Sequence, residues 1–441
     1  MSKFRKQHMT IDWQEMVDHE NICPAADAPL KDKAVLVGRV GLMALGSGTG
    51  AWRVRSYMNK IARALGITCI ADIGLLSIEY TCIDGGEIYT NALSLTNTGV
   101  NTHKIMALDE FLEGFGERSG RYSMEQFHRI LDKFQDMKGN YSDVSLGLAS
   151  AVACCAFTFL LGGGLAEMIC AFFGAGVGNF VRRKLLGRHI TLFANVSVSV
   201  AAACAAYVLS FKLATLTLGI SDVHQAGYIC SMLFVIPGFP LITGGIDLSK
   251  LDLRSGLERI TYALLIIIVA TMTGWLTATV FRFRPSDLAS PEFSVPVKTM
   301  LRLVTSFFGV YGFSLMFNSP KKMAFTAGLI GMIANTLRLL LVDFTPVTIG
   351  VAAFIGALSA GLMASAIKRF IGFPRITLTV PSIVIMVPGL FMYRGIYGIA
   401  GGGDVTEGFM WLVKAFLIVF ALPMGLIFAR ILTDKNFRRI S

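Results

Sequence analysis

Two proline–glycine pairs lie deep inside apolar stretches of the sequence, at Pro237–Gly238 and Pro388–Gly389. A proline lacks the N–H that a helix needs and clashes with the preceding turn, so each pair predicts a broken helix. Breaking a helix frees backbone polar groups, which in hydrocarbon must be buried in protein or face a water-filled cavity. The N-terminus of a half-helix can hold a carboxylate through its N–H groups and its dipole. The pairs therefore predict a binding site for a small solute such as an amino acid or an organic acid.

Polar side chains inside or beside apolar stretches extend this candidate site, because burying them is expensive and usually marks function. The predicted substrate-binding residues are Pro237, Gly238, Thr243, Gly244, Asn179, Asn335, Arg338, Thr379, Pro388, Gly389 and Arg394. Five carboxylates are close enough to the membrane to relay a coupling proton: Glu167, Asp222, Asp247, Glu258 and Glu407. For each of these acids taken singly, an interfacial or snorkelling position is the competing interpretation.

Catalytic, metal and nucleotide chemistry find no support in the residue spacing. The six histidines show no metal-ligand spacing with one another or with cysteine, and no Ser-His-Asp or Cys-His arrangement suggests an enzyme. The segment Gly46–Gly50 lacks the preceding strand and the Lys-Ser/Thr ending of a phosphate-binding loop. We interpret it as a glycine-rich break or close-packing point in a helical region. No catalytic residue, cofactor or metal is predicted.

The elements that position these residues are predicted to be membrane helices. Of the 441 residues, 54% are hydrophobic and only 16% are charged, and charge becomes scarce after about Ser142. Ten apolar segments there have the roughly 17 to 25 residues needed to cross ~30 Å of hydrocarbon. They lie at 144–161, 165–181, 191–211, 226–246, 257–280, 300–317, 323–342, 347–367, 376–397 and 409–430.

Basic residues cluster in the loops after the even-numbered segments and at the C-terminus, which predicts that these loops and both termini face the cytoplasm. The clusters are Arg182, Arg183, Lys184 and Arg188; Lys250, Arg254 and Arg259; Lys321 and Lys322; Lys368, Arg369 and Arg375; and Lys435, Arg438 and Arg439. This clustering accounts for the net charge of +11 without a nucleic-acid partner. The first thirty residues lack the apolar stretch of a secretory signal. We expect a multi-pass protein of the cell (inner) membrane.

The two halves of the membrane region resemble each other in sequence. Phe157-Thr158, Ala171, Asn179 and Arg182 match Phe313-Ser314, Ala327, Asn335 and Arg338 at one constant offset, and Ile236-Pro237-Gly238, Gly244 and Gly274 match Val387-Pro388-Gly389, Gly395 and Gly425 at a slightly shorter one. This indicates a duplicated five-helix unit. Because five is odd, the second copy must enter the membrane from the opposite side. Inverted repeats of this kind recur in secondary transporters, where they give alternating access to a central site.

The region before the membrane helices is predicted to be a small α+β domain. Helix is predicted from Lys33 to Leu65, β structure at Ile67–Cys82 and Glu87–Leu95 with a hairpin turn at Asp84-Gly85-Gly86, and helices at Thr102–Phe115 and Ser123–Met137. The predicted fold is thus membrane all-α, with about ten transmembrane helices in two inverted five-helix repeats after a small cytoplasmic α+β domain. The predicted domains are a possibly flexible tail at 1–32, the α+β domain at 33–142, the repeats at 143–281 and 299–433, and a cytoplasmic tail at 434–441.

Several motifs together resemble the threonine/serine exporter family. They are Leu45-Gly46-Ser47-Gly48-Thr49-Gly50-Ala51-Trp52-Arg53-Val54, then Tyr57-Met58, Ile61-Ala62-Arg63-Ala64-Leu65-Gly66, Thr98-Gly99-Val100-Asn101, Leu161-Gly162-Gly163-Gly164, Val235-Ile236-Pro237-Gly238 and Val387-Pro388-Gly389. The resemblance implies a cytoplasmic N-terminal domain, about ten membrane helices and export of threonine and serine coupled to the proton motive force. The family also includes relatives split into two chains that look like dicarboxylate exporters. One departure is Arg55, where the family usually has an acid.

The sequence therefore leaves three functions open. The first is a proton-coupled exporter of threonine, serine or similar small amino acids, and the second is an exporter of a C4 dicarboxylate such as succinate. A dicarboxylate site needs an extra cation facing inward, for which Arg338 or Arg394 is the candidate. The third is a membrane-anchored hydrolase. The expected partners are the small-molecule substrate, protons and membrane lipid, and a homo-oligomer is left open.

Overall fold

The computed structural model describes residues 11–16, 23–283, 288, 290–401, 403–435 and 437–438, and the statements below concern these residues. Within the predicted tails, residues 1–10, 17–22, 436 and 439–441 lie outside the described part. The chain forms two compact units by its contacts. The first unit comprises Met1–Lys138 and Lys250–Glu258, and the second, which we call the membrane unit, comprises Gly139–Ser249 and Arg259–Ser441. The first unit therefore takes in a short segment from between two membrane helices.

The first unit is a three-stranded antiparallel sheet packed with helices. Its elements are η1 (Ala25–Asp27), α1 (Leu30–Gly46), α2 (Ala51–Ala64), β1 (Thr68–Ile73), β2 (Ser77–Asp84), β3 (Glu87–Ser94), α3 (Thr102–Glu113), α4 (Phe115–Ser119) and α5 (Met124–Gln135). The strand order is β1-β2-β3. The register pairs Ile73 with Ile78 and Asp84 with Glu87, so both connections are tight turns.

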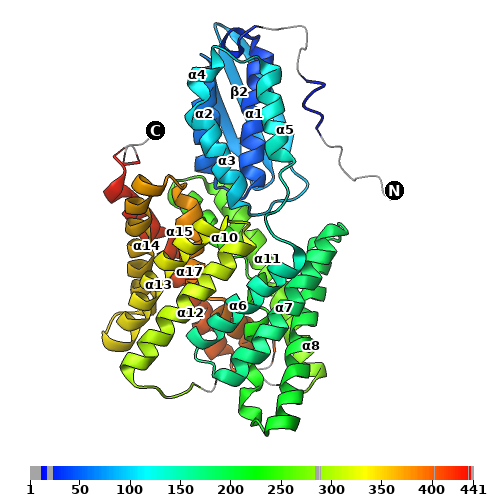
Figure 1. Ribbon diagram of the computed structural model, residues 1–441, viewed down its shortest axis with the longest axis vertical. Coiled ribbons are helices and arrows are strands. Elements are labelled where there is room, and N and C mark those ends of the chain that lie inside the picture. Colours follow the sequence, from blue (N-terminus) through cyan, green and yellow to red (C-terminus); the bar gives the residue numbers. More distant parts are fainter. Residues whose placement is uncertain are drawn as a thin grey trace. The chain divides into compact units, whose positions relative to one another are not determined.

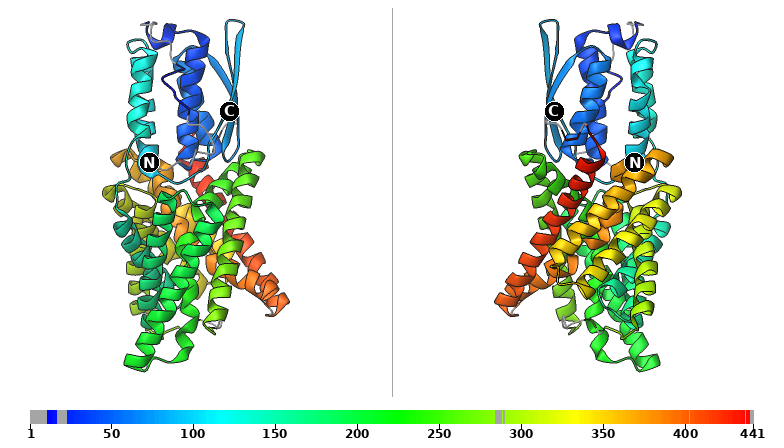
Figure 2. Two further views of the ribbon diagram at one scale, coloured as in Figure 1. Left: turned by 90° about the vertical axis from the view of Figure 1, so that its right-hand side faces the viewer. Right: turned by 90° about the vertical axis from the view of Figure 1, so that its left-hand side faces the viewer.

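Alternation along the strands decides which face of the sheet is buried. Ile78, Tyr80 and Cys82 of β2 point to one side and are buried against α1, whereas Ile70 and Ile88 remain exposed on the other strands. Figure 2 shows the sheet along one side of α1 and α5 along its other side. Ser123 caps the start of α5 with the predicted capping box. Its hydroxyl accepts the backbone N–H of Gln126, and the side chain of Gln126 accepts the backbone N–H of Ser123.

Two details of this unit refine the interpretation of the sequence. The β-rich run Ile67–Cys82 is two strands rather than one, because the chain turns between β1 and β2, where Gly74 donates its N–H to Ser77 O over 2.8 Å. The helical region Lys33–Leu65 is divided at the expected glycine-rich break. There Gly48 has φ +89°, and a Cβ on it would lie 2.7 Å from the carbonyl oxygen of Gly99. The break is thus a close-packing point, as expected.

The membrane unit consists of long apolar helices and two bent helix pairs. Its elements are α6 (Asp143–Leu160), α7 (Leu165–Gly187), α8 (Leu192–Leu218), η2 (Asp222–Gly227), α9 (Tyr228–Ser231), η3 (Leu233–Val235), α10 (Gly238–Ser249), α11 (Leu253–Val280), α12 (Val295–Met316), α13 (Lys321–Phe344), α14 (Ile349–Ile371), α15 (Arg375–Ile383), η4 (Val384–Met386), α16 (Gly389–Ala400) and α17 (Val405–Thr433). Among the described residues, eight helices are long and apolar enough to cross a membrane, or up to ten spans if each bent pair counts as one. The helix α11 begins in the first unit and continues through the membrane unit.

The packing of the membrane unit follows the predicted duplication. The pair α6 and α7 corresponds to α12 and α13, and α6 also packs against α12 (Figure 1). Around the breaks, α9 packs against α16 and α10 against α15. Each half of one bent pair therefore meets the opposite half of the other, which is the pairing expected when the second repeat runs in the opposite sense.

Candidate functional site

The candidate site begins at the two breaks, which have the same backbone construction. The first bent pair, His224–Val235 with Gly238–Ser249, bends by 58°, and the second, Arg375–Met386 with Gly389–Ala400, bends by 45°. A short 3-10 turn precedes each break. At each break the glycine donates its N–H across the proline, from Gly238 to Ile236 O over 2.8 Å and from Gly389 to Val387 O over 2.9 Å. A three-residue turn of this type closes on itself and leaves the preceding carbonyls without helical partners.

The two breaks contact each other. A Cβ on Gly238 would lie 2.6 Å from Val384 Cγ2, and a Cβ on Gly389 would lie 3.2 Å from both Ile236 Cγ1 and Leu233 Cδ2. Each glycine thus faces the 3-10 turn of the opposite break, and neither can gain a side chain without displacing it. The sequence-predicted residues Pro237, Gly238, Pro388 and Gly389 therefore lie at one crossing point in the structure.

A matched pair of arginines reaches the carbonyls that precede the breaks. Arg182, on α7, donates from Nη1 to Phe234 O over 3.3 Å, and Arg338, on α13, donates from Nη1 to Met386 O over 3.4 Å. The two arginines occupy matching places in the repeats. Arg338 Nε is buried and has no hydrogen-bond partner among the described residues, so it is a donor available to a water molecule or a solute. Arg182 was not among the predicted site residues, although its match to Arg338 was visible in the sequence.

The two predicted asparagines hold helices together. Asn179 Nδ2 donates to Leu146 O on α6 over 2.8 Å, and Asn335 Nδ2 donates to Ser306 Oγ on α12 over 2.9 Å. Both side chains are buried. Each therefore joins the second helix of its repeat to the first, which is a packing role. Asn335 Oδ1 is a buried acceptor without a partner in the described part of the chain.

The remaining predicted residues point in several directions. The Thr243 hydroxyl donates a hydrogen bond to Phe239 O within α10 over 3.0 Å. Gly244 and Thr379 are buried within α10 and α15. Arg394, on α16, places its guanidinium over the ring of Trp411 on α17, 5.1 Å from the ring centroid. Among the predicted polar side chains, Arg338 contacts a break through its bond to Met386 O.

Two tyrosines that the sequence analysis did not single out bridge the bent pairs. The hydroxyls of Tyr228 on α9 and Tyr393 on α16 lie 2.7 Å apart, and both side chains are buried. Their rings meet edge to face with centroids 6.2 Å apart. An aromatic ring with a polar tip beside a predicted break is the signal that would have identified them.

Among the five candidate carboxylates, two are buried in the membrane unit. Glu167, at the start of α7, is fully buried, accepts Gly164 N–H at Oε2 over 3.0 Å and lies 2.6 Å from His224 Nδ1 through Oε1. Asp247, on α10, pairs with the buried Arg259 on α11 over 3.2 Å. Around the Glu167–His224 pair, Tyr207 donates its hydroxyl to His224 O over 2.7 Å.

The other three carboxylates lie elsewhere. Glu407 is exposed at the start of α17 and accepts the Trp411 Nε1–H over 3.2 Å. Glu258 belongs to the first unit, and the side chain of Asp222 lies outside the described part. No group of three or more His, Cys, Asp or Glu side chains within the described ranges could hold a metal ion.

A cavity of about 370 Å³ lies at the ends of α14, α15 and α17, away from the breaks. It is lined by Leu362, Ser365, Ala366, Lys368, Arg375 and Thr433. Arg375 begins α15, the first part of the second bent pair, and donates from Nη2 to Thr433 Oγ1 over 3.1 Å. The cavity therefore borders the start of the second bent pair.

Comparison with known proteins finds family models that match most of the chain and relatives that match about half of it. Residues 35–281 match the family model ThrE, described as "Putative threonine/serine exporter", and residues 302–432 match a second model described as "Threonine/Serine exporter, ThrE". A "Probable succinate transporter subunit YjjP" of Klebsiella aerogenes is 24% identical over 249 residues, which is 53% of this chain and 90% of the relative. The protein of the same name from Escherichia coli K12 is 24% identical over 250 residues, 53% of this chain and 91% of the relative. No solved structure matches the chain. The matched proteins are transporters, which sets aside the membrane-anchored hydrolase.

Proposed function

Because the chain belongs to the threonine/serine exporter family and is a membrane transporter, we propose that it exports small amino acids such as threonine and serine across the cell membrane. The observation that carries the proposal is the crossing of the two broken spans, where Gly238 and Gly389 each face the other break. Carbonyls freed near the middle of a membrane can receive an ammonium group, while a guanidinium such as Arg338 can receive a carboxylate. A zwitterion supplies both groups.

The paired halves of the bent spans support alternating access as the proposed mechanism. On one side of the crossing, α9 packs against α16, and on the other, α10 packs against α15. In our proposal these two pairs separate in turn, and the solute moves between them past the breaks. In this proposal the Tyr228–Tyr393 hydroxyl contact holds the α9–α16 side closed. With the N-terminus in the cytoplasm, this is the external side.

Coupling to protons is part of the proposal and is supported by Glu167 and His224. A fully buried carboxylate that contacts an imidazole at the beginning of the first broken span can bind and release a proton as that span moves. Protonation at this pair would connect the proton gradient to the opening of the α9 side. The proposed direction is export, with the inner membrane as location and both termini in the cytoplasm.

A C4 dicarboxylate such as succinate is the second candidate substrate, and a specific observation favours it. The repeats place one arginine at each break, Arg182 and Arg338, and two cations suit two carboxylates. Two relatives are also named as probable succinate transporter subunits. Arg394, the other cation considered for this role, is directed to Trp411.

Efflux from proteoliposomes tests the proposal. Vesicles loaded with radiolabelled threonine, serine or succinate should release threonine and serine faster when a pH gradient is applied. Pro237→Ala and Pro388→Ala should lower this efflux more than they lower membrane insertion, whereas Pro296→Ala, in the first turn of α12, serves as the matched control. Release of succinate alone would favour the second candidate. Unchanged efflux in both proline variants would remove the crossing as the binding site.

A further inference from the structure

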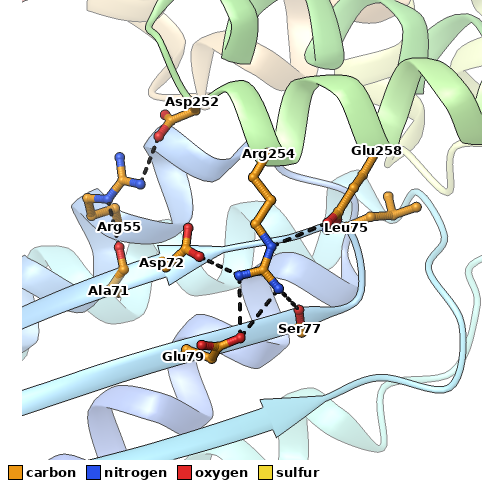
Figure 3. A network of polar contacts seen from close by, with 9 residues as sticks. All are labelled: Arg55, Ala71, Asp72, Leu75, Ser77, Glu79, Asp252, Arg254 and Glu258. Carbon is orange, nitrogen blue, oxygen red and sulfur yellow. Dashed lines mark hydrogen bonds and ion pairs between the residues drawn. The ribbon is translucent and has the colours of Figure 1, made fainter.

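The first turn of α11 is held by the sheet of the first unit through Arg254 (Figure 3). Its guanidinium pairs with Asp72 on β1, with Glu79 Oε1 on β2 over 3.3 Å, and with Ser77 Oγ over 3.4 Å. Within its own helix it also pairs with Glu258 over 3.3 Å. Four acceptors around one planar cation fix its position better than a single ion pair does.

Two further contacts fasten the same segment on either side of Arg254. Asp252 Oδ1 accepts from Arg55 Nη2 on α2 over 2.8 Å, and Glu258 Oε2 accepts the backbone N–H of Leu75 over 2.5 Å. A Cβ on Gly74 would lie 2.9 Å from that same Glu258 oxygen, so the turn between β1 and β2 is shaped to admit the carboxylate. The segment Lys250–Glu258 is thus bound through Asp252, Arg254 and Glu258, and we call it the docked segment.

The residue after the docked segment begins a different set of contacts. Arg259 pairs with Asp247 of α10 over 3.2 Å, and both side chains are at most 2% exposed. The docked segment and Arg259 are joined directly in the chain, since α11 runs from Leu253 to Val280. The helix α10 is the second half of the first broken span and starts at the break. Consecutive residues of α11 therefore carry the contacts to the sheet and the ion pair to α10.

The second repeat lacks these charged residues. At the offset that matches Pro237 with Pro388, the counterparts of Arg254, Glu258 and Arg259 are Val405, Phe409 and Met410, and the counterpart of Asp247 is Gly398. None of these residues carries a charge. The two broken spans are therefore held differently, although their breaks are built alike.

We propose that Arg254 is a positioning residue for transport, through which the first unit anchors α11 and thereby restrains α10 during the movement of the first broken span. The inference rests on the proposed function and adds a role for the first unit. The ion pairs of Arg254 are partly exposed, so they respond to salt, whereas the Asp247–Arg259 pair is buried and breaks with difficulty. In this proposal the ion pairs between Arg254 and the sheet can be released, whereas the ion pair between Arg259 and Asp247 of α10 stays in place.

Charge reversal tests the proposal. Arg254→Glu should lower the maximal efflux rate with little change in KM, by about two- to thirtyfold, the range given by a coupling free energy of about 0.5–2 kcal/mol. Adding Asp72→Arg and Glu79→Arg to that variant should restore most of the rate. The matched control is Arg129→Glu, which reverses an exposed arginine paired with Glu125 on α5 of the same unit and should leave efflux unchanged.

A second readout does not depend on knowing the substrate. A cysteine placed at the exposed Ser249, the last residue of α10, should react faster with a maleimide when Arg254→Glu is present. In the unsubstituted chain carrying that cysteine, raising the ionic strength from about 0.05 M to about 1 M should raise the reaction rate in the same direction, because salt screens the exposed ion pairs.

The outcomes separate the two proposals. If the protein releases none of the three solutes, the proposed function fails, and the labelling of the Ser249 cysteine still decides the anchoring. If Arg254→Glu matches Arg129→Glu in both efflux and labelling, the anchoring proposal is wrong. Loss of efflux without recovery in the reversed-charge triple variant, together with unchanged labelling, would also overturn it.

Discussion

Glu167 is the side chain on which proton coupling depends in this proposal. Glu167→Gln keeps the size and the bond to Gly164 N–H but removes the titrating group beside His224. The pH gradient should then no longer accelerate efflux, while exchange of labelled for unlabelled solute without a gradient should continue. Efflux measured with and without the gradient checks this. Glu407→Gln, at an exposed acid of α17, is the control, and full acceleration in Glu167→Gln would contradict the assignment.

His128, in the first unit, predicts how that unit responds to acid. Its side chain is 1% exposed, and burial together with the adjacent Arg39 guanidinium lowers the pKa of His128 to about 3. The unfolded chain binds the proton below about pH 6.5, whereas the folded unit does not bind it until about pH 3. The stabilisation linked to neutral His128 is therefore fully present above pH ~6.5. Below that pH the free energy of unfolding falls by ~1.4 kcal/mol per pH unit as the pH drops toward ~3.

Fluorescence of Trp13 and Trp52 can follow this loss in the full chain once Trp275 and Trp411 are replaced by phenylalanine. Urea midpoints should fall between about pH 6.5 and about pH 5. In His128→Asn, whose Oδ1 can still accept from Arg39, the dependence should be flatter. Equal slopes in the two proteins would show that another group causes the loss.

At the scale of elements, the crossing of the two broken spans predicts unequal tolerance at matched glycines. Gly238→Ala places a Cβ 2.6 Å from Val384, whereas the nearest atoms to a Cβ on Gly389 are 3.2 Å away. Overpacking of this kind costs about 1–3 kcal/mol, so Gly238→Ala should lower both the melting temperature and the efflux rate more than Gly389→Ala does.

Gly187→Ala provides the comparison for these two variants. Gly187 ends α7 in the same unit and has no described atom within 4 Å of an added Cβ, so its substitution should change neither measurement. Should Gly238→Ala behave like Gly187→Ala, the close approach of the breaks would be refuted.

Local sequence patterns predicted the elements better than they predicted the contacts. The paired breaks and the hairpin at Asp84-Gly85-Gly86 follow from local backbone rules, and the structure confirms them. The sequence pattern did not show that the run Ile67–Cys82 is two strands. Between β1 and β2 lie Gly74, Leu75 and Leu76, and the two leucines continue the apolar run instead of marking a turn. Periodicity identifies an element, whereas a turn inside an apolar run depends on what packs around it.

The sequence predicted where the helix breaks lie, but it did not predict which side chains surround them or what those side chains contact. Pro237 and Pro388 identified the crossing, because a proline in the interior of an apolar span removes a helical hydrogen bond whatever packs around it. The roles of Asn179 and Thr243 could not be inferred, since a hydroxyl or amide in a helix can equally bond its own or a neighbouring backbone. The Tyr228–Tyr393 and Glu167–His224 contacts join residues far apart in sequence, and no spacing rule connects such pairs.

For the whole molecule, the number of spans between two loops decides whether the loops lie on the same side of the membrane. Three spans separate Arg188 from Glu292, counting α8, the first bent pair and α11. A cysteine at Arg188 should therefore be protected from an impermeant maleimide in intact cells, and one at Glu292 should react. Labelling before and after permeabilisation measures this, with the unsubstituted chain as background, and the reverse pattern would overturn the proposed orientation.

The docked segment also has a consequence for how the protein is made. Residues 1–138 leave the ribosome before Lys250–Glu258, yet both belong to the first unit, and Lys250–Glu258 is synthesised only after four spans of the first repeat. The sheet of that unit must wait, with the acidic face around Asp72 and Glu79 unfilled, until Arg254 has been translated. The first unit can therefore be completed only after the first broken span has been synthesised.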